Sequence, residues 1–321
     1  MRAFRPIETI GFVGLGVMGE PMCRNLARRL AETGAERLIV FDVRAEPVER
    51  LAADGAAVAP SLDALVATAD VVCLSLPGGP EVEDVVTRPG GILDNARDGT
   101  IVLDLSTTPV ELTRKLAERL GERGLSLVDA PVARTRQAAE DGTLAIMVGG
   151  DDEAVRAVWP ILTTMASDIA HCGGHGAGQM VKILNNMVLF QTVHALAEAL
   201  AVARRAGLDG KVLFDALSNG SADSFAVRNH GMKALLPGDF PERAFPVTYA
   251  AKDLSYALDL ANSVGLSLAG ADAVRAAFHA AEAAGDGARY WPVIGRTIDD
   301  AGPNARDRCA TTTRTTGEEA R

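Results

Sequence analysis

Three glycines near the N-terminus have the spacing that binds a phosphate group against the start of a helix. The stretch "GFVGLGVMGEPM" places Gly14, Gly16 and Gly19 in a G-x-G-x-x-G pattern. The apolar run 9–14 predicts a strand before this pattern, and the residues after it predict a helix. Glycines permit a tight turn and let the backbone approach a pyrophosphate, and a helix N-terminus favours negative charge. A glycine turn without a ligand is the alternative, but the strand–turn–helix context favours a dinucleotide site.

Further candidates for this site end the neighbouring apolar runs. The second run ends at Asp42, and an acidic residue there accepts hydrogen bonds from ribose hydroxyls and repels a 2′-phosphate. NAD is therefore favoured over NADP, although Arg44, two residues later, could hold a phosphate. The residues that we expect to contact the cofactor are Gly14, Leu15, Gly16, Val17, Met18, Gly19, Asp42, Leu76 and Pro77.

A second polar group lies within an apolar helical stretch. In "GAGQMVKILNN", Lys182, Asn185 and Asn186 stand at i, i+3 and i+4, so they share one helix face. Adjacent asparagines are unfavourable in a helix, and polar groups among apolar neighbours need partners. A solvated surface stripe is the alternative. A lysine desolvated in a cleft has a lowered pKa and can transfer protons near neutrality, so this face is a candidate catalytic site.

Two arginines follow an apolar run in an otherwise acidic chain. The stretch "DAPVARTRQAAEDGTL" places Arg134 and Arg136 just after the predicted strand 125–131. Either they are ordinary solvated charges, or one of them faces an anion. A guanidinium offers a planar fork of donors that suits a sulfonate, a carboxylate or a phosphate.

The elements that must position these residues change character near residue 176. Before it, short apolar runs alternate with amphipathic segments, which is typical of a parallel sheet covered by helices on both faces. The sequence therefore predicts a doubly wound α/β domain over 1–175. The predicted strands are 9–14, 37–42, 71–77, 100–106, 125–131, 144–150 and 168–173.

The second half of the chain is predicted to be all-helical. A long helix over 178–205 is expected to join the two domains. Shorter helices are predicted over 209–218, 248–263 and 270–284. We expect this helical domain to span 176–302, and the polar, Thr-rich tail 303–321 to be disordered.

Composition limits the class of function. The 321 residues include 42 Asp and Glu against 32 Lys and Arg, a net charge of -10 that disfavours a nucleic-acid partner. The chain has no run of about 18 apolar residues and no signal-peptide pattern, so neither a membrane span nor secretion is expected. The four cysteines show no C-x-x-C spacing, so we expect reduced thiols in the cytoplasm and no metal site.

Together these stretches resemble the β-hydroxyacid dehydrogenase family, the relatives of 3-hydroxyisobutyrate and 6-phosphogluconate dehydrogenases. The motifs "GFVGLGVMGEPM", "DLSTTP", "DAPV…DGTLAIMVGG", "GAGQMVKILNN" and "AAKDLSYAL" stand in the family's order, to about residue 300. The resemblance implies a Rossmann domain, a long interdomain helix and a helical domain that often dimerises, hence a homodimer or homotetramer. It also implies oxidation of a small 3-hydroxy acid, or reduction of the matching aldehyde acid.

The resemblance further implies roles for single residues. Lys182 would be the general acid/base, which donates a proton to the carbonyl oxygen while NADH delivers hydride. Asn185 and Asn186 would orient the substrate and the lysine.

Three more residues receive roles in the same way. Ser106 would contact the substrate and Thr107 the cofactor. Lys252 would reach the nicotinamide side of the cleft, although its spacing alone favours a surface ion pair with Asp253.

One motif departs from the family's pattern. Most members follow "DAPV" with Ser-Gly-Gly, whereas this chain has Ala133, Arg134 and Thr135. An Arg-Thr pair looks like the sulfolactaldehyde reductase branch, where an arginine followed by a threonine grips a sulfonate. We therefore expect Arg134 and Thr135 to bind an anionic substrate, and Arg136, where that branch has serine, to be a solvated charge.

Other functions stay open at this point. A carboxylate substrate of the 3-hydroxyisobutyrate, tartronate semialdehyde or succinic semialdehyde type could also pair with Arg134. A non-catalytic dinucleotide-binding scaffold would share the same fold. A reductase of imines is a third possibility, but that branch usually lacks the lysine found at position 182.

Overall fold

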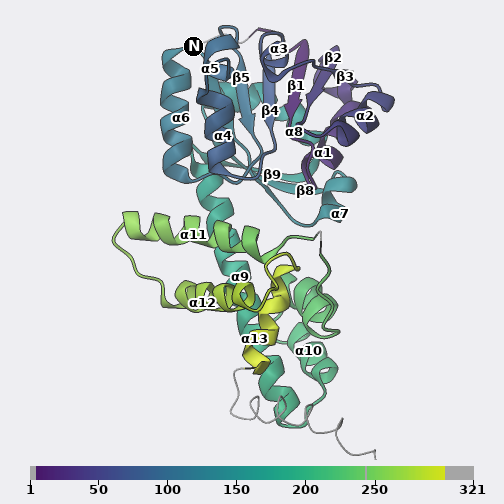
Figure 1. The fold of residues 1–321 in the computed structure, drawn as a ribbon, viewed down its shortest axis with the longest axis vertical. Coiled ribbons are helices and arrows are strands. Elements are labelled where there is room, and N and C mark those ends of the chain that lie inside the picture. Colours follow the sequence, from purple (N-terminus) through teal and green to yellow (C-terminus); the bar gives the residue numbers. More distant parts are fainter. Residues whose placement is uncertain (1–4, 243, 301–321) are drawn as a thin grey trace, which may run out of the picture. The chain divides into compact units, whose positions relative to one another are not determined.

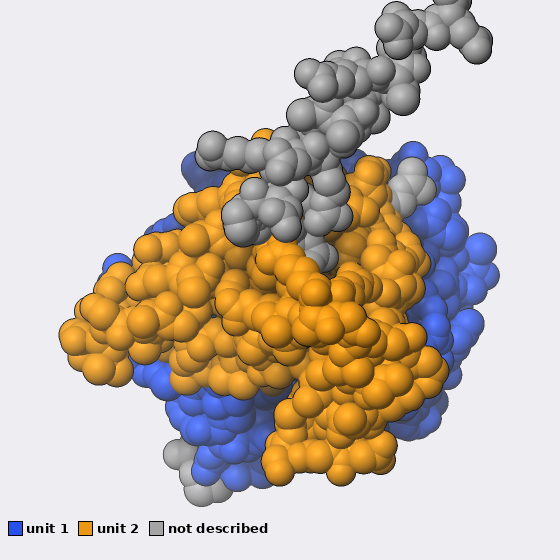
Figure 2. Space-filling model, turned by 90° about the horizontal axis from the view of Figure 1, so that it is seen from below, with its two compact units in different colours: residues 1–183 blue, residues 184–321 orange. Residues whose placement is uncertain are grey.

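The structure, a computed structural model, describes residues 5–242 and 244–300 of the chain. The chain divides into two compact units, residues 1–183 and residues 184–321, coloured blue and orange in Figure 2. The division falls within one long helix, whereas we predicted a boundary at residue 175. The tail predicted over 303–321 lies outside the described residues.

Unit 1 is built on a sheet that has nine strands in the described part of the chain, in the order β3-β2-β1-β4-β5-β6-β8-β7, with β9 beside β8 (Figure 1). The first six strands have the 3-2-1-4-5-6 order of a Rossmann fold. The strands are β1 (Thr9–Val13), β2 (Arg37–Phe41), β3 (Ala57–Val58), β4 (Val71–Leu74), β5 (Ile101–Asp104), β6 (Ser126–Asp129), β7 (Val132–Ala133), β8 (Leu144–Gly150) and β9 (Ala166–Gly173).

The sequence predicted a parallel sheet, and the observed sheet departs from this at one edge. Strands β1 to β6 pair in parallel, but β8 runs antiparallel to β6, with Val128 opposite Gly150. A parallel return needs a crossover of a dozen or more residues, usually through a covering helix. The connection from β6 to β8 has no helix long enough to cover the sheet, since α7 (Arg136–Glu140) has five residues, and β7 pairs with β8 antiparallel.

Each face of the sheet buries its own apolar core, because alternate residues of a strand point to opposite faces. Phe12 and Cys73 belong to the core under α1, α2 and α8, whereas Val13 and Leu74 belong to the core under α3, α4 and α6. This arrangement confirms the doubly wound α/β fold. The helices of unit 1 are α1 (Gly19–Arg28), η1 (Leu30–Thr33), α2 (Ala45–Ala53), α3 (Leu62–Val66), α4 (Gly79–Thr87), α5 (Ile92–Asn95), α6 (Val110–Glu122), α7 and α8 (Asp152–Thr163).

The long predicted helix is α9 (Ala177–Arg205), which contributes residues to both units. By length and composition alone α9 could cross a membrane, so the sequence argument against a span was too strong. A core helix of a soluble protein passes the same test, and this is weak support for a membrane span.

Unit 2 is helical, and its core gathers around aromatic side chains. The ring of Phe190 lies 4.8 Å from that of Trp291 and 5.5 Å from that of Phe278. The three shorter helices that we predicted are present. The π-helix η2 and the helix α13 were not predicted. In η2, the sequence "VRNHGMKAL" interrupts the apolar residues with glycine and polar residues. The elements of unit 2 after α9 are α10 (Gly210–Ser218), η2 (Val227–Leu235), α11 (Val247–Ser263), α12 (Ala269–Ala283), η3 (Trp291–Val293) and α13 (Ile294–Asp300).

Candidate functional site

The glycine loop between β1 and α1 needs its three glycines for different reasons. Gly14 has φ of 92°, and a Cβ there would lie 2.3 Å from the Ser75 carbonyl oxygen. A Cβ at Gly19 would lie 2.1 Å from the Gly14 carbonyl oxygen. A Cβ at Gly16 would meet nothing within 4 Å. The fold itself therefore requires Gly14 and Gly19, whereas the open space at Gly16 fits a pyrophosphate that lies against the backbone.

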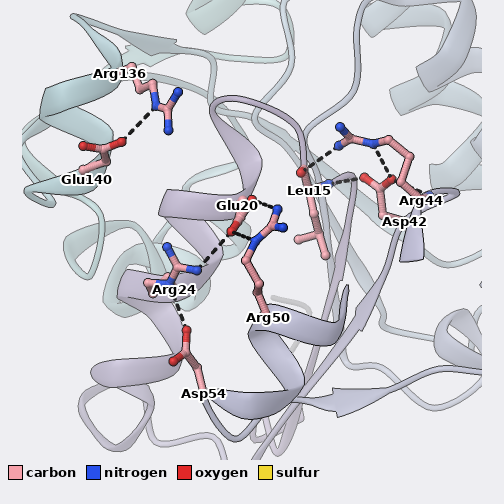
Figure 3. A network of polar contacts seen from close by, with 9 residues as sticks. All are labelled: Leu15, Glu20, Arg24, Asp42, Arg44, Arg50, Asp54, Arg136 and Glu140. Atoms are coloured by element: carbon pink, nitrogen blue, oxygen red, sulfur yellow. Dashed lines mark hydrogen bonds and ion pairs between the residues drawn. The ribbon is translucent and has the colours of Figure 1, made fainter. Parts of the chain in front are cut away.

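Asp42, directly after β2, holds this loop in place (Figure 3). Its Oδ2 accepts the Leu15 amide at 2.6 Å, and its Oδ1 accepts the Arg44 amide at 2.8 Å and Arg44 Nε at 3.2 Å. Arg44 Nη2 also donates to the Leu15 carbonyl at 2.9 Å. Burial raises the pKa of Asp42, but these hydrogen bonds outweigh it and hold the pKa below its usual value. The carboxylate is therefore ionised near neutral pH, which makes it a strong acceptor for ribose hydroxyls.

The first turn of α1 is tied to α2 by an ion-pair network, also drawn in Figure 3. Glu20 accepts both Arg50 Nε and Arg50 Nη2 at 2.8 Å, and Arg24 Nη2 at 3.0 Å. Arg24 Nε bonds Asp54 at 2.8 Å. The Arg50 hydrogen bond is the main reason why the pKa of Glu20 is lowered. The network orients α1, whose N-terminus follows the glycine loop.

The ends of β4 and β5 are joined through the Ser106 hydroxyl. Ser106 Oγ accepts the Leu76 amide at 2.9 Å and donates to the Leu74 carbonyl at 3.4 Å. Ser106 is buried, Leu76 and Thr107 are half-buried, and Pro77 is exposed. These predicted residues thus meet on one rim, where Ser106 also has a structural role that sequence reasoning missed.

Next to this rim lies a buried polar cluster that the sequence analysis did not single out. Asp104 Oδ1 accepts the Ser106 amide at 2.9 Å, and Asp104 Oδ2 accepts the Thr108 hydroxyl at 2.8 Å. Burial raises the pKa of Asp104 to about 6, although the hydrogen bonds from Ser106 and Thr108 oppose the rise. The sequence does show an aspartate at the end of an apolar strand, which could have indicated this cluster. It does not show that distant segments enclose this aspartate.

A second buried carboxylate anchors the start of α9. Asp129, at the end of β6, accepts the Gly176 amide at 2.8 Å and the Gln179 amide at 2.9 Å. Burial raises the pKa of Asp129 despite these two bonds. Lys182 is half-buried and lies three residues after Gln179 on α9. The helix segment that carries Lys182 therefore starts at the carboxyl edge of the sheet, the edge that also carries the glycine loop.

Arg134 directly follows β7 and has an unusual conformation. It is the sole non-glycine residue of the described chain with a positive φ, 86°, a conformation that favours glycine. Its Nη1 donates to the Thr143 carbonyl at 2.6 Å and to Ser167 Oγ at 2.9 Å, and its Nη2 pairs with Asp168 at 2.8 Å. The predicted anion-binding arginine is thus already paired with a carboxylate within the chain.

The two residues after Arg134 have local partners. Thr135 precedes α7, and its hydroxyl accepts the Ala138 amide at 3.4 Å as an N-cap. Arg136 is exposed and pairs with Glu140 at 2.9 Å within α7 (Figure 3). The Thr135 side chain therefore caps α7, in addition to any role in binding substrate.

The predicted residues of unit 2 form a cluster of their own. Asn186 Nδ2 donates to Asp253 Oδ2 at 2.8 Å, and Asn185 Nδ2 donates to Asn186 Oδ1 at 3.2 Å. Lys252 Nζ lies 3.2 Å from Asp253 Oδ1. The ion pair between Lys252 and Asp253 that spacing favoured is present, but it is not a surface pair, because Asp253 is only 3% exposed and also accepts Asn186.

Aromatic rings complete the surroundings of Lys252. Its Nζ lies 5.7 Å from the ring centre of Tyr249 and 5.3 Å from that of Tyr256. Both distances fit cation–π contacts. Neither tyrosine was a sequence candidate, but both stand one turn from Lys252, which is a helical spacing that could have indicated them.

The candidate residues thus fall into two groups. Unit 1 holds the glycine loop, Asp42, the rim, Arg134 and Lys182, whereas unit 2 holds Asn185, Asn186 and Lys252. Within the described ranges, no group of three His, Cys, Asp or Glu side chains could hold a metal ion.

Two family models match the chain one after the other. The NAD-binding domain of 6-phosphogluconate dehydrogenase matches residues 9–174, and the NAD-binding domain of NADP-dependent 3-hydroxyisobutyrate dehydrogenase matches residues 176–290. The chain therefore belongs to the β-hydroxyacid dehydrogenase family, which confirms the resemblance drawn from its motifs.

Individual relatives agree with this assignment. The chain is 37% identical over 268 residues to 3-hydroxyisobutyrate dehydrogenase of Pseudomonas aeruginosa, covering 83% of this chain and 86% of that one. It is 33% identical over 288 residues to 3-sulfolactaldehyde reductase of Escherichia coli, covering 90% and 95%. The structure of Mycobacterium tuberculosis 3-hydroxyisobutyrate dehydrogenase with L-serine superposes with a TM-score of 0.81 at 33% identity, covering 91% and 99%. The protein is thus an NAD(P)-binding dehydrogenase or reductase of hydroxy acids.

Proposed function

We propose that the protein uses NAD(H) to interconvert a small anionic 3-hydroxy compound and its aldehyde, with reduction of a sulfolactaldehyde-type substrate as the favoured reaction. The observation that carries this proposal is the anchoring of α9 by Asp129. It puts the helix start that bears Lys182 on the same sheet edge as the glycine loop. The group that transfers hydride and the group that transfers the proton must both reach the same substrate, so they should lie at the same edge of the sheet.

The chain's own residues would handle the proton and the substrate. A bound nicotinamide supplies hydride to the carbonyl carbon in reduction and accepts hydride in oxidation. Protonated Lys182 donates a proton to the carbonyl oxygen in reduction, and neutral Lys182 takes it from the hydroxyl in oxidation. Asn185 and Asn186 orient the substrate and the lysine, and the Asp253 carboxylate keeps Asn186 in one orientation.

NAD is the proposed cofactor because of Asp42. Its ionised carboxylate stands at the tip of β2, where it can accept ribose hydroxyls and repel a 2′-phosphate. Arg44, the residue that could favour NADP, already bonds Asp42 and the Leu15 carbonyl. Its charge is therefore partly compensated within the loop.

Arg134 supports an anionic head group, with Thr135 beside it. The guanidinium fork suits a sulfonate better than a nest of backbone amides does. Asp168 competes for the same guanidinium, so a substrate with a strong anion would have to share or displace it. A carboxylate substrate of the 3-hydroxyisobutyrate, tartronate semialdehyde or succinic semialdehyde type is the alternative, and the P. aeruginosa relative is named for such an acid.

A matched set of substrates tests the proposal. Purified protein is assayed for NADH oxidation with three-carbon aldehydes that carry a sulfonate, a phosphate or a carboxylate, and again with NADPH. We expect turnover with NADH and the highest kcat/KM with the sulfonate. A clear preference for the carboxylate would favour the alternative substrate, and no turnover with any aldehyde would refute the proposed reaction.

We also propose that the protein forms a homo-oligomer, a dimer or a tetramer, in the cytoplasm. Helix α9 exposes four apolar side chains, and association of two copies would remove such side chains from water. They are Val181, Leu184, Val188 and Val202. Free thiols at Cys23 and Cys73 fit a reducing compartment. A monomeric mass by light scattering at all concentrations would contradict the oligomer.

A further inference from the structure

We propose that Gln179 is a positioning residue whose buried carboxamide fixes the helix turn that bears Lys182 against the β5–α6 turn that bears Ser106 and Thr107. This inference rests on the proposed function, because it assigns Lys182 the proton transfer. Gln179 would act on the reaction through Lys182, without touching the substrate.

The carboxamide of Gln179 is fully enclosed and uses both of its ends. Its Oε1 accepts the Thr108 amide at 3.0 Å, and its Nε2 donates to the Ser106 carbonyl at 2.8 Å. Nε2 also lies 3.4 Å from Asp104 Oδ2. An apolar side chain at this position would leave these enclosed polar groups without their partner, which is unfavourable. Both the oxygen and the nitrogen of the Gln179 carboxamide thus have hydrogen-bond partners.

The backbone around Gln179 is held as closely as its side chain. Asp129 accepts the Gln179 amide as well as that of Gly176. A Cβ at Gly178 would lie 2.4 Å from the Met147 carbonyl oxygen and 2.8 Å from that of Asp129. Helix α9 therefore begins in direct contact with the sheet, and a shift of its first turn would break several bonds together.

The helix carries this constraint to Lys182. Residues three apart on an α-helix stand on the same side, one turn from each other. Because Gln179 bonds the turn that carries Ser106 and Thr107, it sets how far Lys182 stands from that rim. A misplacement of about 1 Å in a reacting geometry can lower the rate by about 100-fold.

The first test is Gln179→Met, which keeps the length of the side chain and removes its hydrogen bonds. We expect kcat to fall by about 10- to 100-fold, while KM for NADH changes by less than about twofold, because the glycine loop is untouched. Gln191→Met makes the same chemical change further along α9 and should leave kcat unchanged. Equal kcat values in the Gln179 variant and the wild type would overturn the proposal.

Two further measurements test the proposal if Gln179→Met folds poorly or if the protein shows no turnover. Hydrogen–deuterium exchange of the wild type should show slow exchange over 176–182, and Gln179→Met should speed it, whatever the substrate is. Fast exchange in the wild type would refute the bracing itself. Gln179→Glu keeps the acceptor for the Thr108 amide but loses the donor, so its kcat should also fall, and a wild-type kcat would contradict the proposal. If the wild type exchanged slowly over 176–182 but turned over no aldehyde, the proposed reaction would be refuted and the bracing by Gln179 would stand.

Discussion

Two glycine turns at the same edge of the unit 1 sheet are each held by an aspartate at the end of a strand. Asp42 accepts the amide of Leu15 in the loop before α1, and Asp129 accepts the amides of Gly176 and Gln179 at the start of α9. The local design is the same, because a carboxylate that accepts backbone amides fixes a turn. What surrounds the carboxylates is different.

Asp42 lies beside the exposed cation of Arg44 and is half-buried as a residue, whereas Asp129 is fully enclosed. Arg44 and the loop amides lower the pKa of Asp42, and burial raises the pKa of Asp129. The Asp42 side chain is itself only 7% exposed, so a ligand would have to share a carboxylate that already holds the loop. A fully enclosed one, such as Asp129, can only anchor the chain. We therefore propose cofactor binding for the first turn and placement of Lys182 for the second.

The largest expected effect separates the two turns by function. Lys182→Ala should lower kcat by about 1,000-fold or more, because it removes the proposed general acid/base. The affinity for NADH, measured by fluorescence titration, should stay within about twofold of the wild type. Lys115→Ala, an exposed lysine on α6, serves as the control. If NADH binding fell together with kcat, the two turns would not have separate roles.

A second prediction uses the opposite pKa shifts near the two turns. The pKa of Asp104, beside the Asp129 turn, is raised to about 6 in the folded protein, so between about pH 4 and 6 folding takes up a proton. The free energy of unfolding should therefore fall as pH rises through this window, by up to about 3 kcal/mol from Asp104. Asp104→Asn should remove this fall.

Urea unfolding of the wild type and of Asp104→Asn at several pH values checks this point. The variant's stability relative to the wild type should rise between about pH 4 and 6 and then level off. Glu122→Gln, an exposed carboxylate on α6, should show no such rise. Parallel pH profiles for wild type and Asp104→Asn would mean that Asp104 is ionised in the folded protein as readily as in the unfolded one.

The Asp42 turn should respond to mutation through the cofactor. Asp42→Ala removes the acceptor of the Leu15 amide and releases Arg44, so NADH should bind more weakly by about 2 kcal/mol, or about 30-fold. NADPH should gain relative to NADH, because the freed guanidinium can meet a 2′-phosphate. Titration with both cofactors measures the ratio, with Asp84→Ala, at an exposed position on α4, as the control. An unchanged ratio would show that Asp42 only shapes the loop.

The smallest change in activity is expected from a mutation of Asp168, an exposed carboxylate that pairs with Arg134. Asp168→Asn should free Arg134 and lower KM for an anionic aldehyde by up to about fivefold, because an exposed ion pair is worth at most about 1 kcal/mol. Glu140→Gln, which makes the matching change at Arg136, should leave KM unchanged. A raised KM in Asp168→Asn would show that the pair must stay intact for substrate binding.

Local patterns predicted much of the fold and one part of the site. Gly14, Gly16, Gly19 and Asp42 were found by spacing, because a strand–turn–helix unit is contiguous in sequence. The antiparallel return of β8 and the π-helix η2 were missed, because they depend on packing rather than on periodicity. Substrate contacts and the roles of Lys182 and Lys252 stay predictions.

By itself, the sequence determined the family, the dinucleotide loop and the helix that carries Lys182, since each is written in contiguous residues. Only the tertiary structure decided which polar groups are enclosed and what they bond. Gln179 bonds Thr108 across 71 residues, Asn186 bonds Asp253 across 67, and Arg134 pairs with Asp168 across 34. The physical reason is that burial and ion pairing depend on segments brought together from far along the chain, and these surroundings set the charge of Asp104 and the partner of Arg134.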